Sequence, residues 1–215
     1  MQNDEPSASG ATSSSETAAV PATRKRPKPG ERRVQILQAL AAMLEQPGAE
    51  RVTTAALAAR LEVSEAALYR HFASKAQMFE GLIDFIEQSV FTLVNQIVER
   101  EAPAREQAAR IVAMLVQFAE KNPGMTRVMV GDALVFENER LQNRMNQFFD
   151  KIEATLRQSL REGAAGEGSA TPSLDAQVRA SALTAFVIGR LQRFARSGFR
   201  RAPSEHLDAA VALML

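Results

Sequence analysis

Hydrophobic residues recur every three to four positions along most of the chain, the spacing of helices with one buried face. The first stripe begins at Glu31 and stops at the breaker Pro47-Gly48. Two short helices are expected within "RVTTAALAARLEVSEAALYRHF", separated by the residues Glu62-Val63-Ser64. Thr53 or Thr54 can cap the first and Ser64 the second, because a hydroxyl accepts hydrogen bonds from the unpaired N–H groups of an opening turn.

Longer helical stripes occupy the rest of the chain. Further helices are predicted over residues 74–100, 103–122, 141–160, 174–197 and 204–215, with a short helical or irregular piece around 125–136. Gly and Ala predominate in "EGAAGEGSATPS" (162–173), which predicts a flexible connection. Sustained strand-like alternation is absent from the sequence, so the predicted fold class is all-α.

Composition narrows the classes of protein that fit. A chain of 215 residues with 46% hydrophobic residues can build a substantial core. The absence of cysteine excludes a disulfide framework and thiolate metal sites. Neither a secretory signal pattern nor an apolar run of the roughly 20 residues that span a bilayer is present. We therefore expect a cytoplasmic protein with no membrane segment.

Charge is balanced overall and clustered locally. The formal net charge is +1, from 26 basic and 25 acidic residues. Residues 1–23 carry no base, whereas "RKRPKPGERR" (24–33) carries six basic residues against one acidic residue, Glu31. This pattern predicts a disordered tail over 1–29 whose basic end adds phosphate contacts, and therefore affinity rather than sequence choice.

The two short helices match a helix-turn-helix unit, whose second helix enters the major groove. Ala66 and Ala67 are small enough for the backbone to approach base edges, and the polar residues that follow can reach phosphates. Alternatively, Tyr69 and Phe72 are ordinary core residues and the nearby charges are solvated. The predicted DNA-contacting residues are Arg32, Arg33, Thr53, Thr54, Ser64, Glu65, Ala66, Ala67, Tyr69, Arg70, His71 and Lys75.

The stretch "RVTTAALAARLEVSEAALYRHFASKAQMF" resembles the DNA-binding part of the TetR family. The resemblance continues through "NPGMTRVMVGDALVFENERLQNRMNQFFDKIEATLRQSLRE", where the chain is similar to the nucleoid-occlusion members of that family. It implies a DNA-binding domain over 30–74 and a helical dimerisation and partner-binding domain over 75–215. One departure is Glu62, which stands where many members place glycine and must tolerate or avoid a left-handed backbone.

The resemblance also implies partners. Such proteins are expected to bind palindromic chromosomal sites as dimers and, when bound to DNA at the nucleoid, to block assembly of the tubulin-like division protein FtsZ. The implied FtsZ-binding residues, in a groove between the helix that begins near Lys75 and the next, are Phe85, Ser89, Met114, Gln117, Lys121 and Asn122. Leu93 stands where a second arginine is expected, so binding to an acidic tail is expected to be weaker or to use another base.

The position of Phe85 gives an independent indication of a partner site. At 100° per residue, Phe85 lies about 120° from the centre of the apolar stripe of its helix. An aromatic residue there either packs under a neighbouring helix or serves as an anchor for a partner.

The last two helices are more apolar than an isolated pair should expose, which predicts a four-helix dimer interface. Two-fold symmetry would then match two half-sites about 34 Å apart. Alternatively, these residues complete the core of a monomer. The predicted interface residues are Val178, Leu183, Phe186, Val187, Leu191, Phe194, Leu207 and Val211.

Other functional classes have less support. The chain has two histidines, His71 and His206, and lacks nucleophile-elbow, phosphate-loop and zinc patterns, so we expect no enzyme, cofactor or metal. A ligand-responsive TetR-type repressor is the main alternative, and a helical adaptor that binds only protein is another. In the repressor, the residues that would line a small-molecule pocket, or else fill the core, are Met114, Phe118, Met129, Phe148 and Phe149.

Overall fold

The computed structural model describes residues 30–46, 51–100, 103–166 and 170–215. These residues form helices and no strand, which confirms the all-α prediction; the predicted tail 1–29 lies outside them. The helices are α1 (Glu31–Leu44), α2 (Thr54–Arg60), α3 (Glu65–Tyr69), α4 (Lys75–Val98), α5 (Ala104–Lys121), α6 (Pro123–Met129), the 3-10 helix η1 (Asp132–Leu134), α7 (Glu139–Gly166), α8 (Pro172–Arg196) and α9 (Leu207–Met214).

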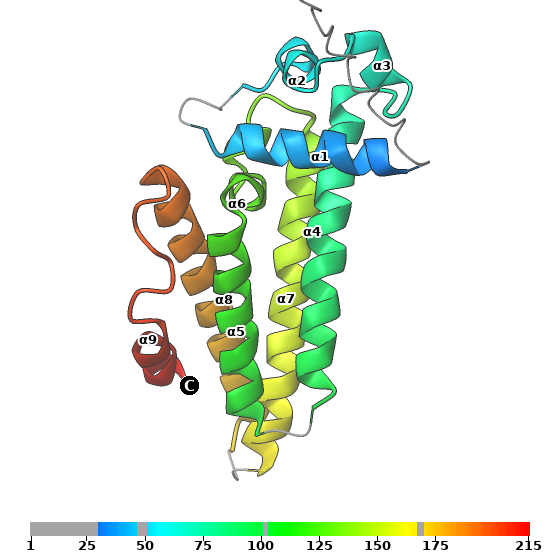
Figure 1. Ribbon diagram of the computed structural model, residues 1–215. Helices are drawn as coiled ribbons and strands as arrows, with labels where there is room; N and C mark the ends of the chain where they lie inside the picture. The colour runs from blue at the N-terminus through cyan, green and yellow to red at the C-terminus, as the bar shows by residue number, and fades with distance from the viewer. Residues whose placement is uncertain (1–29, 47–50, 101–102, 167–169) are drawn as a thin grey trace, which may run out of the picture.

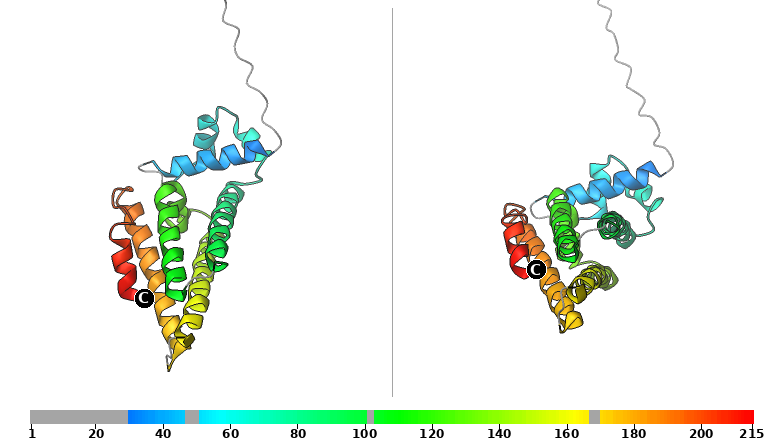
Figure 2. Two further views of the ribbon diagram at one scale, coloured as in Figure 1. Left: turned by 60° about the horizontal axis from the view of Figure 1, so that its bottom comes forward. Right: turned by 90° about the horizontal axis from the view of Figure 1, so that it is seen from below.

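Helices α1, α2 and α3 form a small unit at one end of a bundle of long helices (Figure 1). The bundle contains α4, α5, α7 and α8, and α9 lies along its outer side beside α8. Figure 2 shows from two further directions that α1 crosses over the ends of the long helices. Helix α4 is continuous from the small unit into the bundle, so it connects the two parts mechanically.

Hydroxyl caps begin α2, α3 and α4, as the sequence predicts. The Oγ1 atom of Thr53 accepts from the N–H of Ala56 at 3.1 Å, so Thr53 rather than Thr54 caps α2. Ser64 caps α3 and Ser74 caps α4 in the same way, at 3.3 and 3.2 Å. Each cap satisfies a donor that the first turn of a helix leaves without a backbone partner.

The turn between α2 and α3 accepts a left-handed residue that is not glycine. Glu62 has φ of 53°. Its N–H donates to the carbonyl of Ala59 at 3.1 Å, and the N–H of Val63 donates to the carbonyl of Ala58 at 3.0 Å. This pair of bonds is the Schellman arrangement, which usually places glycine at the left-handed position. The backbone thus adopts this left-handed turn despite Glu62.

Two helix boundaries around the predicted connection 162–173 differ from the sequence prediction. Helix α7 continues to Gly166, into the segment expected to be a flexible connection, because Ala and Glu are good helix formers and each Gly costs only about 1 kcal/mol. Helix α8 begins already at Pro172. In addition, "NPG" both ends α5 and starts α6, since Pro123 occupies the first turn, where no N–H partner is needed.

A very close contact between α6 and α1 positions the small unit on the bundle. The backbone of Gly124 in α6 approaches α1 so closely that a Cβ atom there would lie 2.0 Å from the carbonyl oxygen of Ala41. Only glycine fits such a contact without movement of one helix. Helix α6 therefore fixes the position and orientation of α1 on the bundle, and as a result also those of α2 and α3.

Candidate functional site

The exposed surface of α3 carries the residues expected to meet DNA. Ser64, Glu65, Ala66 and Arg70 are exposed, and Tyr69 is 45% exposed. Phe72, three residues further on, is 1% exposed. The core alternative was therefore right for Phe72 and wrong for Tyr69, whose phenol remains free to reach a ligand.

Several of the predicted DNA contacts also hold the unit together. The hydroxyl of Thr54 donates to the carboxylate of Glu65 at 2.6 Å and so ties α2 to α3. The guanidinium of Arg33 donates to the carbonyl of His71 and lies 4.1 Å from the centre of the Phe72 ring. Arg33 thus secures α1 against the end of α3, and its remaining N–H groups stay available to solvent or to a phosphate.

Lys75 is engaged elsewhere in this structure. Its Nζ lies 2.5 Å from Oε1 of Glu137, whose side chain is only 10% exposed, and 5.7 Å from the centre of the Phe79 ring. The sequence did not indicate this pairing, because Glu137 lies 62 positions away. A contact between Lys75 and a phosphate stays a prediction, and such a phosphate would have to compete with Glu137.

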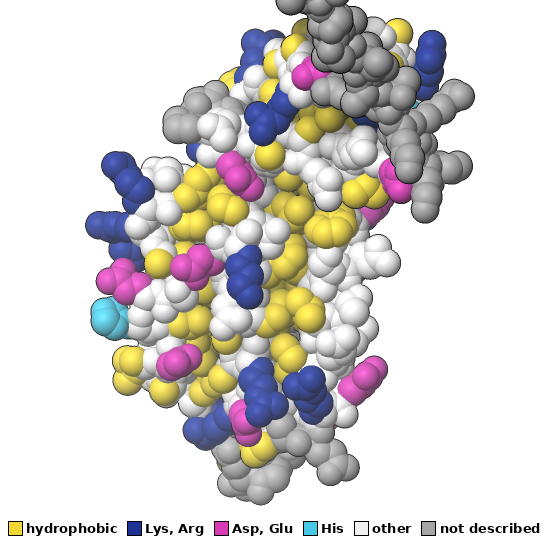
Figure 3. Space-filling model, in the orientation of Figure 1, with side chains coloured by type: hydrophobic (Ala, Val, Ile, Leu, Met, Phe, Trp, Pro, Cys, Tyr) yellow, Lys and Arg dark blue, Asp and Glu magenta, His cyan; other side chains and the backbone are white. Residues whose placement is uncertain are grey.

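The face formed by α4 and α5 is a second candidate site. Phe85 is 49% exposed, which agrees with its position off the apolar stripe of α4. Ser89 and Met114 are half-buried, and Gln117 is exposed. Figure 3 shows hydrophobic side chains gathered over this face of the molecule. A surface with a free aromatic ring among half-buried neighbours can hold the apolar part of a peptide.

One end of this face is polar. Lys121 is exposed at the end of α5. The side-chain amide of Asn122 donates to the carbonyl of Phe118 at 2.7 Å, so it occupies a carbonyl at the C-terminal end of α5 where α6 begins. Leu93, which stands where a second cation is expected, is 39% exposed and extends the apolar part instead.

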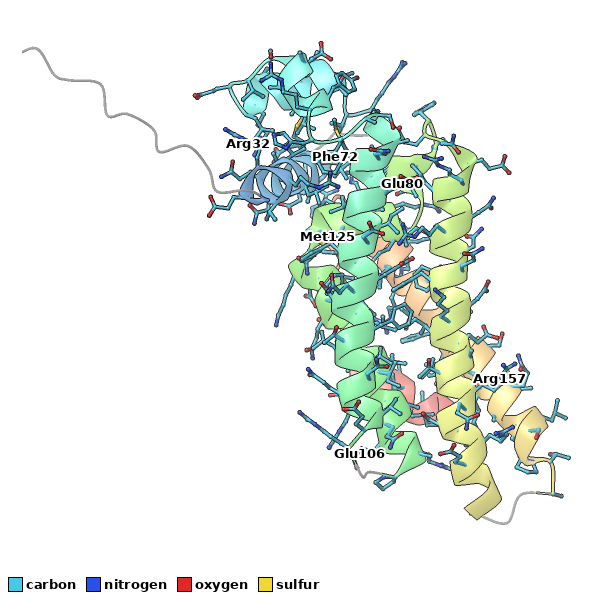
Figure 4. All side chains as sticks on the ribbon, turned by 90° about the vertical axis from the view of Figure 1, so that its right-hand side faces the viewer. Arg32, Phe72, Glu80, Glu106, Met125 and Arg157 are labelled. Atoms are coloured by element: carbon cyan, nitrogen blue, oxygen red, sulfur yellow. The ribbon has the colours of Figure 1, made fainter. Side chains whose placement is uncertain are left out.

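On its other side, α4 is held to α7 by ion pairs. Arg140 lies 2.6 Å from Glu80, and Arg144 lies 2.5 Å from Asp84 and 2.6 Å from Glu87. In Figure 4 the labelled Glu80 lies between α4 and α7. The hydrogen bonds that the Arg144 guanidinium donates to Glu87 and then to Asp84 raise its pKa.

The predicted dimer interface needs correction. Most of its residues are already buried within one chain and have no surface left to bury against a partner, so they belong to the core of the protomer. They are Leu183, Val187, Leu191, Phe194, Leu207 and Val211. Val178 is 59% exposed and Phe186 is half-buried, so a dimer contact through them stays a prediction. The sequence analysis missed Leu174, which is 61% exposed, whereas Leu213 on the apolar face of the last helix is 90% exposed.

The residues considered for a small-molecule pocket pack into the core. Met129 and Phe149 are at most 8% exposed, and Phe148 is fully buried. The Phe148 ring meets Phe91 and Phe149 edge to face, with centroids 5.5 and 5.1 Å apart. Met114 and Phe118 pack against the same core. Separately, none of the helices in the described ranges is long and apolar enough to cross a membrane.

Both parts of the chain match known families. Residues 36–82 match the family model "Bacterial regulatory proteins, tetR family", and residues 105–215 match "Tetracyclin repressor-like, C-terminal domain" of the SlmA-like group. Among solved structures, the TetR-family transcriptional regulator PfmR from Thermus thermophilus has a TM-score of 0.66 at 22% identity and covers 84% of this chain and 97% of its own, which shows a shared fold.

Curated relatives are much more similar in sequence. The nucleoid occlusion factor SlmA of Aliivibrio fischeri (strain MJ11) is 51% identical over 189 residues, covering 87% of this chain and 96% of the relative. The SlmA protein of Vibrio cholerae is 50% identical over 184 residues, covering 85% and 93%. Neither is described as an enzyme. The chain therefore belongs to the TetR family and, within it, to the SlmA group of nucleoid occlusion factors.

Proposed function

We propose that two copies of this chain bind palindromic chromosomal sites and, while bound at the nucleoid, antagonise assembly of FtsZ, so that division is delayed where DNA remains. The observation that carries this proposal is the 51% identity to a nucleoid occlusion factor over nearly its whole length. The exposed face of α3 and the open face of α4 and α5 support it, because the two lie on different parts of the molecule and leave room for two partners.

DNA recognition would use α3. A helix fits the major groove by its width, and the small side chains of Ala66 and Ala67 allow the backbone to approach base edges. The exposed side chains of Tyr69 and Arg70 can donate to phosphates on either side. Because caps and the Thr54–Glu65 bond hold α2 and α3 together, binding loses little conformational freedom.

FtsZ binding would use the face between α4 and α5. The Phe85 ring offers an apolar anchor, and Lys121 offers a cation at the α6 end of the same face. A tail that carries both apolar and acidic residues matches this combination, since apolar anchors supply affinity and opposite charges supply orientation and rate. Leu93 removes one cation from this arrangement, so we expect it to bind an acidic tail more weakly than a site with two.

Dimerisation would use the outer surface of α8. Leu174 and Val178 are about 60% exposed on this helix, and Phe186 is half-buried further along it. A two-fold contact through α8 would cover these side chains and would place the two α3 helices on the same face of a DNA duplex.

A chromosome-wide crosslinking map tests the proposal. We expect many palindromic sites spread through the chromosome and sparse near the replication terminus, and we expect them to disappear in Tyr69→Ala, whose fold should be intact because Tyr69 is exposed. One or a few promoter peaks, especially at the protein's own gene, would instead identify a ligand-responsive repressor. Absence of all DNA crosslinks would identify an adaptor that binds only protein.

A further inference from the structure

Exposed arginines crowd the end of α8 and the turn that follows it. Arg193, Arg196, Arg200 and Arg201 are all exposed. Within the described part of the chain, no ion pair joins any of them to a carboxylate. We call residues 193–201 the arginine turn. Guanidinium groups that repel one another without a carboxylate partner favour a bound anion.

The arginine turn borders a polar hollow. Arg193 and Arg201 line this hollow of about 240 Å³ together with Arg190, Glu205 and His206. The Glu205 carboxylate inside it would repel a small anion, whereas Arg196 and Arg200 extend the positive charge beyond it. A strip of this kind suits an extended polyanion better than an isolated phosphate.

Hydrogen bonds hold the arginine turn in one conformation. The hydroxyl of Ser197 accepts from the backbone N–H groups of Arg200 and Arg201, at 3.1 and 2.9 Å. Gly198 adopts φ of 62°, and the N–H of Phe199 donates to the carbonyl of Phe194 at 3.0 Å. The backbone that carries the arginines is therefore already ordered, which lowers the entropy lost when an anion binds.

The arginine turn lies close to the DNA-binding unit. The Phe199 ring is 5.2 Å from the guanidinium of Arg127 in α6, and α6 in turn contacts α1 through Gly124. Figure 1 shows the C-terminal end of α8 at the same end of the bundle as α1, α2 and α3. Helix α6 therefore contacts both the arginine turn and α1.

We propose that the arginine turn is a second phosphate-binding surface, which contacts the DNA backbone beyond the base pairs that α3 reads. The proposal rests on the proposed function, because it requires DNA bound through α3. Helix α1 contacts the end of α3 through Arg33, near its start, and contacts α6 through Ala41, near its end. It has 14 residues and is about 21 Å long, so it spans a distance close to the roughly 17 Å between a recognition helix and the centre of a palindrome. In a dimer joined through α8, the two turns would flank that centre and meet phosphates there.

The salt dependence of DNA affinity tests the proposal. Full-length R193Q/R201Q is compared with wild type on a palindromic duplex by fluorescence anisotropy between about 50 and 200 mM salt. Each lost phosphate contact should make the slope of log affinity against log salt less steep by about 0.9. Loss of two contacts means that wild type loses about 12-fold more affinity than the variant across this range. The preferred sequence should not change.

A matched variant controls for net charge. R157Q/R161Q removes two exposed arginines from α7, and Arg157 lies at the far end of the bundle from Arg32 in Figure 4. It should keep the wild-type slope. A wild-type unfolding temperature and oligomeric state in both double variants would confirm that the fold is retained. A shorter duplex that contains one half-site and stops before the palindrome centre should abolish the difference between R193Q/R201Q and wild type.

Equal slopes for wild type and R193Q/R201Q would overturn the proposal while leaving the function intact, provided that Tyr69→Ala loses DNA binding. Equal slope changes in both doubles would also overturn it, since net charge alone would then be responsible. If inorganic pyrophosphate stabilises wild type but not R193Q/R201Q against heat, and DNA slopes are equal, the turn binds small anions instead. If wild type binds no DNA, both proposals fail.

Discussion

Helix α4 has two sides that are used in opposite ways. Toward α7 and the residues just before it, the charged side chains of α4 are paired. Lys75 lies 2.5 Å from Glu137 at one end, and Glu87 lies 2.6 Å from Arg144 further along. Toward α5 it presents Phe85, which is 49% exposed. The fully buried residues between the two sides, among them Ile83, Ile86 and Val90, fix the rotation of the helix and so keep Phe85 at the surface. The comparison shows how one helix can keep an apolar ring available without losing its place in the core.

The largest expected effect distinguishes two neighbouring residues of α4. Ile86 is fully buried and Phe85 is 49% exposed. We expect Ile86→Ala to lower the free energy of unfolding by about 2–5 kcal/mol and Phe85→Ala by less than about 1 kcal/mol, because only the first leaves a cavity. Denaturant unfolding measures both. An equal cost at the two positions would mean that Phe85 packs as a core residue in solution.

The side of α4 that carries Phe85 should contribute to the binding of a partner rather than to the stability of the fold. Phe85→Ala should weaken binding of the FtsZ tail by about 30-fold or more, since removal of a central aromatic anchor costs about 2 kcal/mol. Titration of a labelled tail peptide measures the change, and DNA affinity should remain that of wild type. Gln88→Ala, an exposed position on the same helix, is the control. If Phe85→Ala loses DNA binding as well, its effect is structural.

The ion pairs between α4 and α7 should contribute unequally to the free energy of unfolding. Arg144 donates from two nitrogens to Glu87, at 3.0 and 2.6 Å, and also meets Asp84. Arg144→Gln should therefore lower the free energy of unfolding by about 1–2 kcal/mol. Arg140 is 59% exposed in its pair with Glu80, so Arg140→Gln should cost less than about 0.5 kcal/mol. Thermal or denaturant unfolding would contradict this ranking if Arg140→Gln proved the more costly.

The smallest expected effect is a gain in affinity for the FtsZ tail, from a substitution on the side of α4 that carries Phe85. Leu93 is 39% exposed where a second cation is expected. Leu93→Arg should raise affinity for an acidic FtsZ tail by about 2- to 5-fold, the size of an exposed ion pair. The gain should vanish near about 0.5 M salt, because screening removes exposed charge interactions. Leu93→Gln tests whether loss of the leucine alone is responsible, and an equal gain there would exclude a charge effect.

Local features were the most predictable from the sequence. Thr53, Ser64 and Ser74 cap helices as expected because a cap depends on one side chain and a backbone N–H three residues away. The all-α class followed from apolar spacing in the same way. Helix ends were less predictable, since α7 extends to Gly166 through residues that fit either a helix or a connection.

The candidate sites could be predicted only in part. Tyr69 and Phe85 were recognised as candidate ligand contacts, and both side chains are exposed. The pairing of Lys75 with Glu137 was missed because the two residues are 62 positions apart. The apolar stripe of α8 did not reveal whether its residues face the same chain or a second one, and Leu183 and Val187 proved to face the same chain.

The sequence by itself therefore determined where the helices lie, how they begin and which family they belong to. These properties depend on neighbours a few residues away along the chain, or on motifs that can be read directly. Only the tertiary structure decided that Phe85 and Val178 stay exposed, that Lys75 is paired and that the arginine turn lies beside the DNA-binding unit. Burial and pairing depend on which helices pack together, and the spacing of residues along one helix does not specify its neighbours.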